Sequence, residues 1–159
     1  MSMGRFYTSN VCEDISGFES GYDVFDNHLH NHDDADVIHY VLDSKTDDLV
    51  AYFSLIASAL SYVVGEKTEG IPAVELKMFA MDKKYQGTGL SDLVFDNVIE
   101  AIEILTSEYI GAEIILLYSV PVDHIVELYV KKGFSMIDDS YLAFTSDFTR
   151  GCVPMFKSL

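Results

Sequence analysis

The secondary structure that the sequence favours changes twice between residues 71 and 105, along the stretch IPAVELKMFAMDKKYQGTGLSDLVFDNVIEAIEIL. Residues 71 to 81 favour a strand, and Gly87 and Gly89 then interrupt that pattern. A strand, a glycine-containing turn and a helix therefore follow one another, which is a connection typical of α/β folds. The helix is predicted because apolar residues recur about every four positions: Leu90, Val94, Val98, Ile102 and Leu105.

Similar patterns predict the other elements of a single α/β domain over residues 1–159, with a mixed sheet flanked by helices. The uncharged run from Leu49 to Val64 is shorter than a membrane span of ~20 residues, so we interpret it as buried β-structure. Pro72 is expected to open the next strand. Asp123 is expected to cap a helix that ends at Gly133. Further strands are predicted at 37–42, 112–120, 134–137 and 153–159, turns at 43–48 and 65–70, and helices at 24–29 and 124–132.

The chain is strongly acidic, with Asp+Glu 26 against Lys+Arg 10 and a net charge of −16. Such a surface repels nucleic acids and anionic membranes, and it attracts cationic partners such as amines. The same acidity could serve solubility alone. The N-terminus has no apolar signal region, which predicts a cytoplasmic protein, and the two cysteines, Cys12 and Cys152, form no disulfide framework.

The glycine-containing turn has the features of an anion site. Unpaired backbone N–H groups at the start of a helix, together with the helix dipole, favour phosphate. Lys83 and Lys84 lie just upstream and would make the loop locally positive. The alternative is an ordinary turn between a strand and a helix. The loop matches neither the Walker A motif nor the dinucleotide-binding fingerprint.

Two motifs in this chain resemble those of the GNAT N-acetyltransferase superfamily. The first motif has six positions, with glutamine or arginine at the first, glycine at the fourth and glycine or alanine at the sixth. Residues 86–91 match it except at Ser91. The other places a tyrosine four residues before Gly-Phe, and residues 128–134 match it with Tyr129. The resemblance covers about residues 17 to 159. It implies a mixed, mostly antiparallel sheet flanked by helices, with splayed central strands.

The resemblance also implies an activity, which is direct transfer of acetyl from acetyl-CoA to a primary amine, either a small cationic amine or a protein amino group. No metal is expected. Tyr129 would protonate the departing thiolate as general acid. The strand end formed by Phe79, Ala80 and Met81 would bind the pantetheine arm and polarise the thioester carbonyl. The CoA pyrophosphate would be held by the backbone of Gln86, Gly87, Thr88, Gly89, Leu90 and Ser91.

Glu75 is a second candidate catalytic residue, because a carboxylate on the strand that leads to the thioester site could deprotonate an ammonium group. Each catalytic candidate has a structural alternative. Glu75 could instead pair with Lys77 or with solvent. Tyr129 could be a core aromatic residue whose hydroxyl is hydrogen-bonded.

Within the superfamily, the chain is similar to the toxin branch of toxin–antitoxin proteins, which acetylates aminoacyl-tRNA. The similarity lies in residues 18–29, 51–55, 71–76 and 85–90. An alternative function is therefore acetylation of aminoacyl-tRNA, with an antitoxin as partner, although the net charge argues against a tRNA substrate. Ser91 and Val122 depart from the family pattern and allow a further alternative, a GNAT domain that binds CoA or a partner without turnover. The resemblance also allows a homodimer.

One polar segment has the residue types of a metal site. His28, His30 and His32, followed by Asp33 and Asp34, form HLHNHDD, in which His28 and His32 would share one face of a helix. No further group of ligands with a known spacing follows. An exposed acidic helix end is the favoured interpretation, so no metal is predicted.

Overall fold

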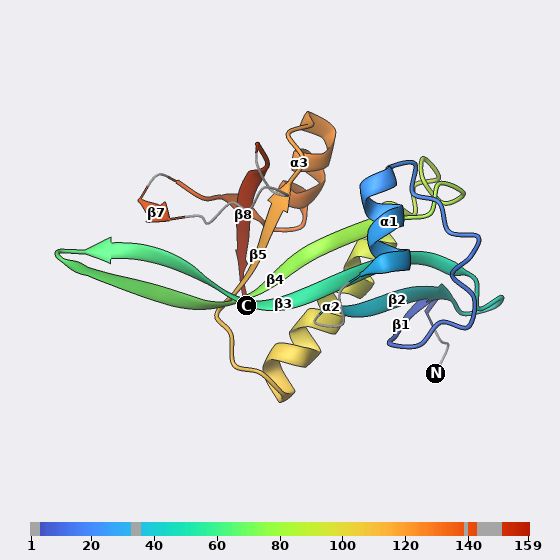
Figure 1. Ribbon diagram of the computed structural model, residues 1–159, viewed down its shortest axis with the longest axis horizontal. Helices are drawn as coiled ribbons and strands as arrows, with labels where there is room; N and C mark the ends of the chain where they lie inside the picture. The colour runs from blue at the N-terminus through green and yellow to red at the C-terminus, as the bar shows by residue number, and fades with distance from the viewer. Residues whose placement is uncertain (1–3, 33–35, 139, 143–150) are drawn as a thin grey trace. The chain divides into compact units, whose positions relative to one another are not determined.

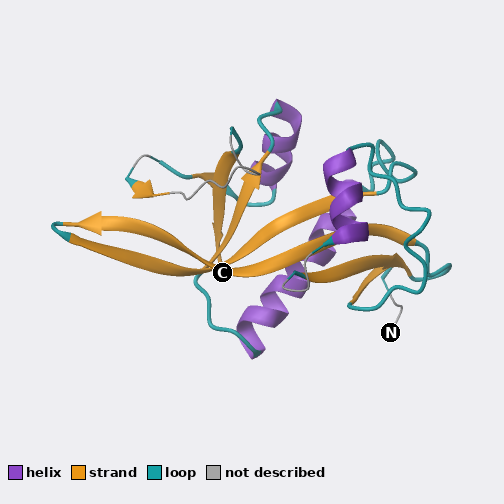
Figure 2. Cartoon of the chain, viewed as in Figure 1, coloured by secondary structure: helices purple, strands orange, loops and turns teal. Residues whose placement is uncertain are grey.

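The computed structural model describes residues 4–32, 36–138, 140–142 and 151–159, and within these ranges it contains three helices and eight strands (Figures 1 and 2). Asp33 and Asp34 lie outside the described residues. The chain divides into two compact units, one of residues 1–55 and 77–104 and the other of residues 56–76 and 105–159. The single domain over residues 1–159 stays a prediction.

The first unit is built on antiparallel strands with a helix on each side. β1 pairs with β2, and β2 pairs with the first part of β3; both pairs are antiparallel. The last part of β4 completes this group of strands. β1 was not predicted. The elements that lie wholly or partly in this unit are β1 (Phe6–Ser9), α1 (Asp23–Asn31), β2 (Val37–Asp43), β3 (Leu49–Val64), β4 (Lys67–Met81) and α2 (Ser91–Glu108).

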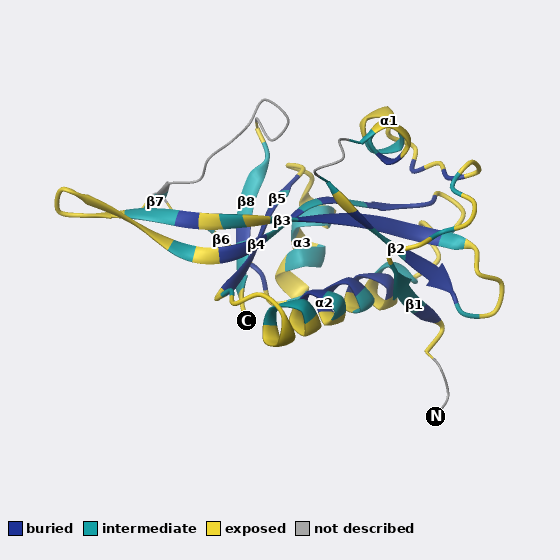
Figure 3. Ribbon diagram, turned by 60° about the horizontal axis from the view of Figure 1, so that its bottom comes forward, coloured by how far each residue is buried: buried dark blue, intermediate teal, exposed yellow. Residues whose placement is uncertain are grey.

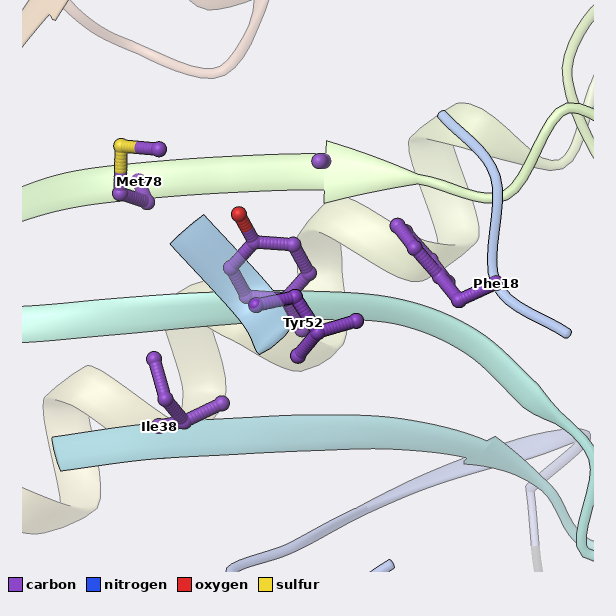
Figure 4. Packing of buried hydrophobic residues seen from close by; sticks show 6 residues of the cluster. Phe18, Ile38, Tyr52 and Met78 are labelled. Carbon is purple, nitrogen blue, oxygen red and sulfur yellow. The ribbon is translucent and has the colours of Figure 1, made fainter. Parts of the chain in front are cut away.

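α1 and α2 cover opposite faces of the strands in this unit (Figure 3). On the α2 face, the rings of Phe79 and Phe95 meet edge to face at 5.3 Å. Met78 and Ala80 point the other way, because side chains alternate along a strand. They join a buried cluster under α1 with Phe18, Leu29, Ile38 and Tyr52 (Figure 4). The hydroxyl of Tyr52 donates to the carbonyl of Phe25 at 2.6 Å, which satisfies its buried polar end.

The second unit contains the parallel strand pair of the fold. β4 pairs in parallel with β5 from Ala73 to Leu76. The other pairs are antiparallel: β5 with β8, β6 with β8, and β7 with β3. Leu60, Ala73, Ile114 and Leu116 form the buried cluster of this unit. Its further elements are β5 (Ile114–Ser119), α3 (Asp123–Lys131), β6 (Ser135–Met136), β7 (Tyr141–Leu142) and β8 (Val153–Ser158).

The β4–β5 ladder is short. It ends at Leu76, although β4 continues to Met81 and β5 continues past Leu117 to Ser119. An early end to this ladder is what splayed central strands require. The predicted mixed, mostly antiparallel α/β sheet flanked by helices is therefore confirmed.

Two local predictions were wrong. The turn predicted at residues 65–70 is confined to Gly65 and Glu66, because β4 already begins at Lys67. Pro72 therefore lies inside β4, where its carbonyl accepts the N–H of Glu113 at 2.9 Å.

The start of α3 also differs from the prediction. Asp123 is the first helical residue, and Val122 is the N-cap without a side-chain hydrogen bond. An aspartate in the first turn still interacts favourably with the helix dipole. None of the helices in the described part of the chain has the length and apolar character needed to cross a membrane.

Candidate functional site

The turn after β4 adopts a backbone conformation that favours glycine. Gly87 has φ 70° and Gly89 has φ 76°, both in the left-handed region. A Cβ atom built at either position would meet no heavy atom within 4 Å. Conformation rather than crowding therefore selects glycine here, and the space in front of the loop is open to a ligand.

The same turn presents a row of unpaired donors. The first hydrogen bond at the start of α2 runs from the N–H of Val94 to the carbonyl of Leu90 at 3.0 Å. Within the residues that the structure describes, no acceptor is bonded to the backbone N–H groups of Gly87, Thr88, Gly89, Leu90 and Ser91. Successive free N–H groups at a helix start form an anion-binding concavity, and the dipole of α2 strengthens it.

Gln86 is exposed, but its hydrogen-bonding groups are engaged with other groups of the protein. Its backbone N–H donates to the carbonyl of Lys83 at 3.3 Å. Its side-chain Nε2 donates to the carbonyls of Ser20 and Met81, at 2.7 and 2.8 Å. The geometry shows Gln86 bracing the loop, and its assignment as a direct CoA contact stays a prediction.

The two lysines before the loop differ in their surroundings. Lys83 forms an ion pair with Glu19, whose hydrogen bond and charge raise the pKa of the lysine. Both side chains are 60% exposed, so the pair contributes little stability, but Glu19 offsets the positive charge of Lys83. Lys84 is exposed. The positive field expected beside the loop is therefore weaker than two lysines would produce.

The strand end predicted to bind the pantetheine arm uses its side chains for packing. Phe79 contacts Phe95, and Ala80 and Met81 are buried. The carbonyl of Met81 accepts from Gln86. Beyond Leu76, β4 forms no ladder pair with β5 in the described part of the chain. Backbone groups of this strand end, rather than its side chains, are therefore the ones that suit an extended ligand.

Tyr129 lies on α3 in the second unit. Its ring meets that of Phe134 edge to face at 6.0 Å, and its carbonyl accepts the N–H of Phe134 at 3.1 Å. The residue as a whole is partly exposed, but burial of its phenol group raises the pKa of Tyr129 to about 12. The hydroxyl therefore carries its proton throughout the physiological pH range and can act as a donor.

Glu75 accepts a hydrogen bond from the hydroxyl of Ser58 at 3.2 Å. The suggested pairing of Glu75 with Lys77 is wrong, because the Lys77 amine binds both carboxylate oxygens of Asp36 at 2.9 Å. Burial, and then the charge of Glu75, raises the pKa of Tyr118 on the neighbouring strand. The catalytic role of Glu75 stays a prediction.

Two polar residues near the candidate site were missed from the sequence. Tyr118 follows Leu116, the β5 partner of Glu75, by two positions, so alternation places it on the Glu75 face. Asp82 is only 2% exposed and accepts the backbone N–H groups of Glu19 and Lys84, at 3.1 and 2.9 Å. An acidic residue directly after an apolar strand was the available indication for Asp82.

The histidine segment takes part in a different cluster. The Nε2 atom of His28 lies 3.4 Å from Oδ2 of Asp36, and the rings of His28 and His32 are 6.2 Å apart. Burial lowers the pKa of His28, and the Asp36 charge opposes that shift. Among the described residues, no group of three or more His, Cys, Asp or Glu side chains could hold a metal ion.

Comparison with solved structures identifies the fold. A bacterial toxin structure has a TM-score of 0.72 and 19% identity over 96% of this chain and 90% of its own. An AtaT mutant toxin bound to the C-terminus of the antitoxin AtaR and acetyl-CoA has a TM-score of 0.66 and 13% identity, covering 98% and 94%. AtaT complexed with acetyl-methionyl-tRNAfMet has a TM-score of 0.69 and 13% identity, covering 96% and 94%.

This chain has the GNAT fold. The likeness is to toxins, as the resemblance of the motifs had indicated, and it is a likeness of structure at low sequence identity. No protein-family model matches the sequence. No curated protein matches it either. In this chain, the glutamine–glycine motif of residues 86–91 lies in the turn between β4 and α2 and reaches the first residue of the helix.

Proposed function

We propose that the protein is an N-acetyltransferase that uses acetyl-CoA. The observation that carries this proposal is the row of unpaired N–H groups from Gly87 to Ser91, which suits a diphosphate. Similar structures support it, because an AtaT mutant toxin is recorded with acetyl-CoA bound. The GNAT fold and the tyrosine motif at Tyr129 fit the same activity.

Acetyl-CoA supplies the acetyl group as a thioester. The amine nitrogen of the acceptor attacks the carbonyl carbon, the carbon–sulfur bond breaks, and the amine proton passes to a base or to water. In this chain, backbone N–H groups at the end of β4 stabilise the oxyanion that forms during the attack. Tyr129 donates its phenol proton to the leaving sulfur, and Glu75 receives the acceptor's proton, directly or through water.

For the acceptor, we propose the amino group of an aminoacyl-tRNA, with an antitoxin as the protein partner. This is favoured by the likeness to AtaT complexed with acetyl-methionyl-tRNAfMet and to the AtaT mutant toxin bound to the antitoxin AtaR. A second candidate is a small cationic amine. The net charge of −16 favours it, because an acidic surface attracts cations and repels the phosphates of tRNA.

Acetyl-CoA should stabilise the folded protein. At ~100 times the dissociation constant, a ligand that binds only the folded state adds ~2.7 kcal/mol. For a chain of this size, that stabilisation raises the midpoint of thermal unfolding by roughly 5–10 °C. Thermal unfolding with and without acetyl-CoA measures it. An unchanged midpoint at millimolar acetyl-CoA would remove the cofactor from the proposal.

A panel of acceptors separates the two candidates. Radiolabelled acetyl-CoA is incubated with the protein and either aminoacyl-tRNAs charged with different amino acids or a set of polyamines. We expect acetyl on the α-amino group of one or a few aminoacyl-tRNAs, with uncharged tRNA as the negative control. Labelling of polyamines alone would favour the small-amine acceptor, and labelling of neither would contradict both.

A further inference from the structure

Hydrogen bonds fasten the chain segment before α1 to the turn that follows β4. The N–H of Lys83 donates to the carbonyl of Glu19 at 2.8 Å. The N–H of Glu19 donates in return to Oδ2 of Asp82 at 3.1 Å. The side chain of Gln86 donates to the carbonyl of Ser20 at 2.7 Å. All of these residues belong to the first unit. We call this set of contacts the loop clamp.

Asp82 is an unexpected residue beside a loop that is proposed to hold a diphosphate, because a carboxylate repels phosphate. Its burial, with 2% exposure, is explained by the two backbone N–H groups that it accepts, from Glu19 and Lys84. One carboxylate oxygen holds the segment before α1, and the other holds the turn. An asparagine would have one acceptor oxygen and could satisfy only one of them.

Gln86 contributes the second half of the clamp. Its Nε2 donates both to Ser20 and to Met81, so the segment before α1 and the end of β4 are joined through one amide group. The donors of this side chain are thus used in hydrogen bonds within the protein. Gln86 acts on the phosphate-binding loop by fixing where the loop begins.

The clamped segment leads directly into α1. Phe18 is buried and contacts the ring of Tyr52 at 5.5 Å (Figure 4). The N–H of Ser20 donates to Oδ1 of Asp26, in the first turn of α1, at 2.8 Å. Ser20 is therefore hydrogen-bonded both to the turn after β4 and to the start of α1.

We infer that Asp82 and Gln86 are positioning residues that couple two segments, the phosphate-binding loop and residues 17–26. Because of this coupling, the two segments become ordered or disordered together. Acetyl-CoA bound to the loop then rigidifies the segment before α1 and the first turn of α1. By linkage, loss of the clamp weakens acetyl-CoA binding without removing any group that contacts it. The inference rests on the proposed acetyl-CoA site.

Hydrogen–deuterium exchange of the full chain tests this coupling. In the wild-type protein, saturating acetyl-CoA should slow exchange in peptides that cover residues 17–26 as well as in those that cover 86–94. In ligand-free Asp82→Asn, both regions should exchange at least about fivefold faster, because one buried N–H loses its acceptor. In that variant, saturating acetyl-CoA should still slow exchange of residues 86–94 but should no longer slow exchange of residues 17–26.

Two further variants make the result specific. Gln86→Glu has the same shape but no side-chain donors at neutral pH, so it should accelerate exchange in the same two regions. Asp43→Asn is the matched control, because Asp43 is also buried but its carboxylate accepts the N–H of Lys45 alone among the described residues, and an amide oxygen can still accept that N–H. This control should have the same exchange rates as the wild type in both regions and the same affinity for acetyl-CoA.

The outcomes separate the inference from the proposed function. Protection of residues 86–94 without protection of 17–26 in the wild-type protein would overturn the coupling and leave the cofactor site intact. Retained protection of 17–26 in Asp82→Asn and Gln86→Glu would overturn the role of the two residues. If acetyl-CoA protects neither region, the cofactor site and the coupling both fail.

Discussion

Replacing Gly89 by glutamate should weaken acetyl-CoA binding by at least about 100-fold while the protein stays folded. Gly89 has φ 76°, and a side chain in that conformation costs about 1–2 kcal/mol, so the loop relaxes to another shape in the free protein. The added carboxylate also repels the diphosphate by about 1 kcal/mol or more at contact distance. Titration calorimetry with acetyl-CoA measures the affinity, and circular dichroism reports the fold.

Gly65→Glu is the matched control for this experiment. Gly65 lies in the turn between β3 and β4 with φ 62°, and a Cβ atom there also meets nothing within 4 Å. The control therefore adds the same charge at a glycine of similar conformation, away from the loop sequence. Its affinity for acetyl-CoA should equal that of the wild type. Equal affinities for both variants and the wild type would contradict the assignment of the loop.

Tyr129→Phe should lower turnover by about 10²–10³-fold and leave the affinity for acetyl-CoA nearly unchanged. General acid catalysis typically contributes factors of that size, and the phenylalanine ring keeps the packing against Phe134. The pKa of Tyr129 is raised to about 12, so the protonated form that donates persists as the pH rises. Turnover of the wild type should therefore show no loss from tyrosine ionisation up to about pH 10.

Steady-state kinetics over that pH range, together with acetyl-CoA titrations, checks the role of Tyr129. Tyr109→Phe serves as control, because Tyr109 is 76% exposed at the end of α2 and should be neutral. If Tyr129→Phe keeps wild-type turnover, the general acid is another group. If it instead loses acetyl-CoA binding, the tyrosine is a structural residue of the core.

The parts of the structure that the sequence predicts well are those determined by local patterns. The apolar spacing from Leu90 to Leu105 defines the buried face of α2, and the uncharged run at Leu49–Val64 is β3 without change of bounds. The glycines of the loop were identified because a left-handed backbone strongly favours that residue. Such features depend on neighbours in the chain, so they are visible before folding.

The parts that were missed depend on contacts between distant residues. β1 has only four residues, and its place at the edge of β2 is determined by pairing rather than by composition. The sequence suggests Lys77 as a partner of Glu75, but Asp36, just before β2, offers the lysine a carboxylate from a distant part of the chain. The burial of Asp82 is determined by the approach of Glu19. Alternation along one strand carries no information about such partners.

The loop clamp also bears on how the chain folds. The hydrogen bond from Glu19 to Asp82 joins residues 63 positions apart, and that from Gln86 to Ser20 joins residues 66 apart. Forming contacts of such separation costs loop-closure entropy, and non-local contacts slow folding. A chain emerging from the ribosome can therefore complete the loop clamp only after β2, β3 and β4, which lie between the joined residues, have been synthesised. The turn after β4 is therefore braced by a chain segment that was synthesised 63 to 66 residues earlier.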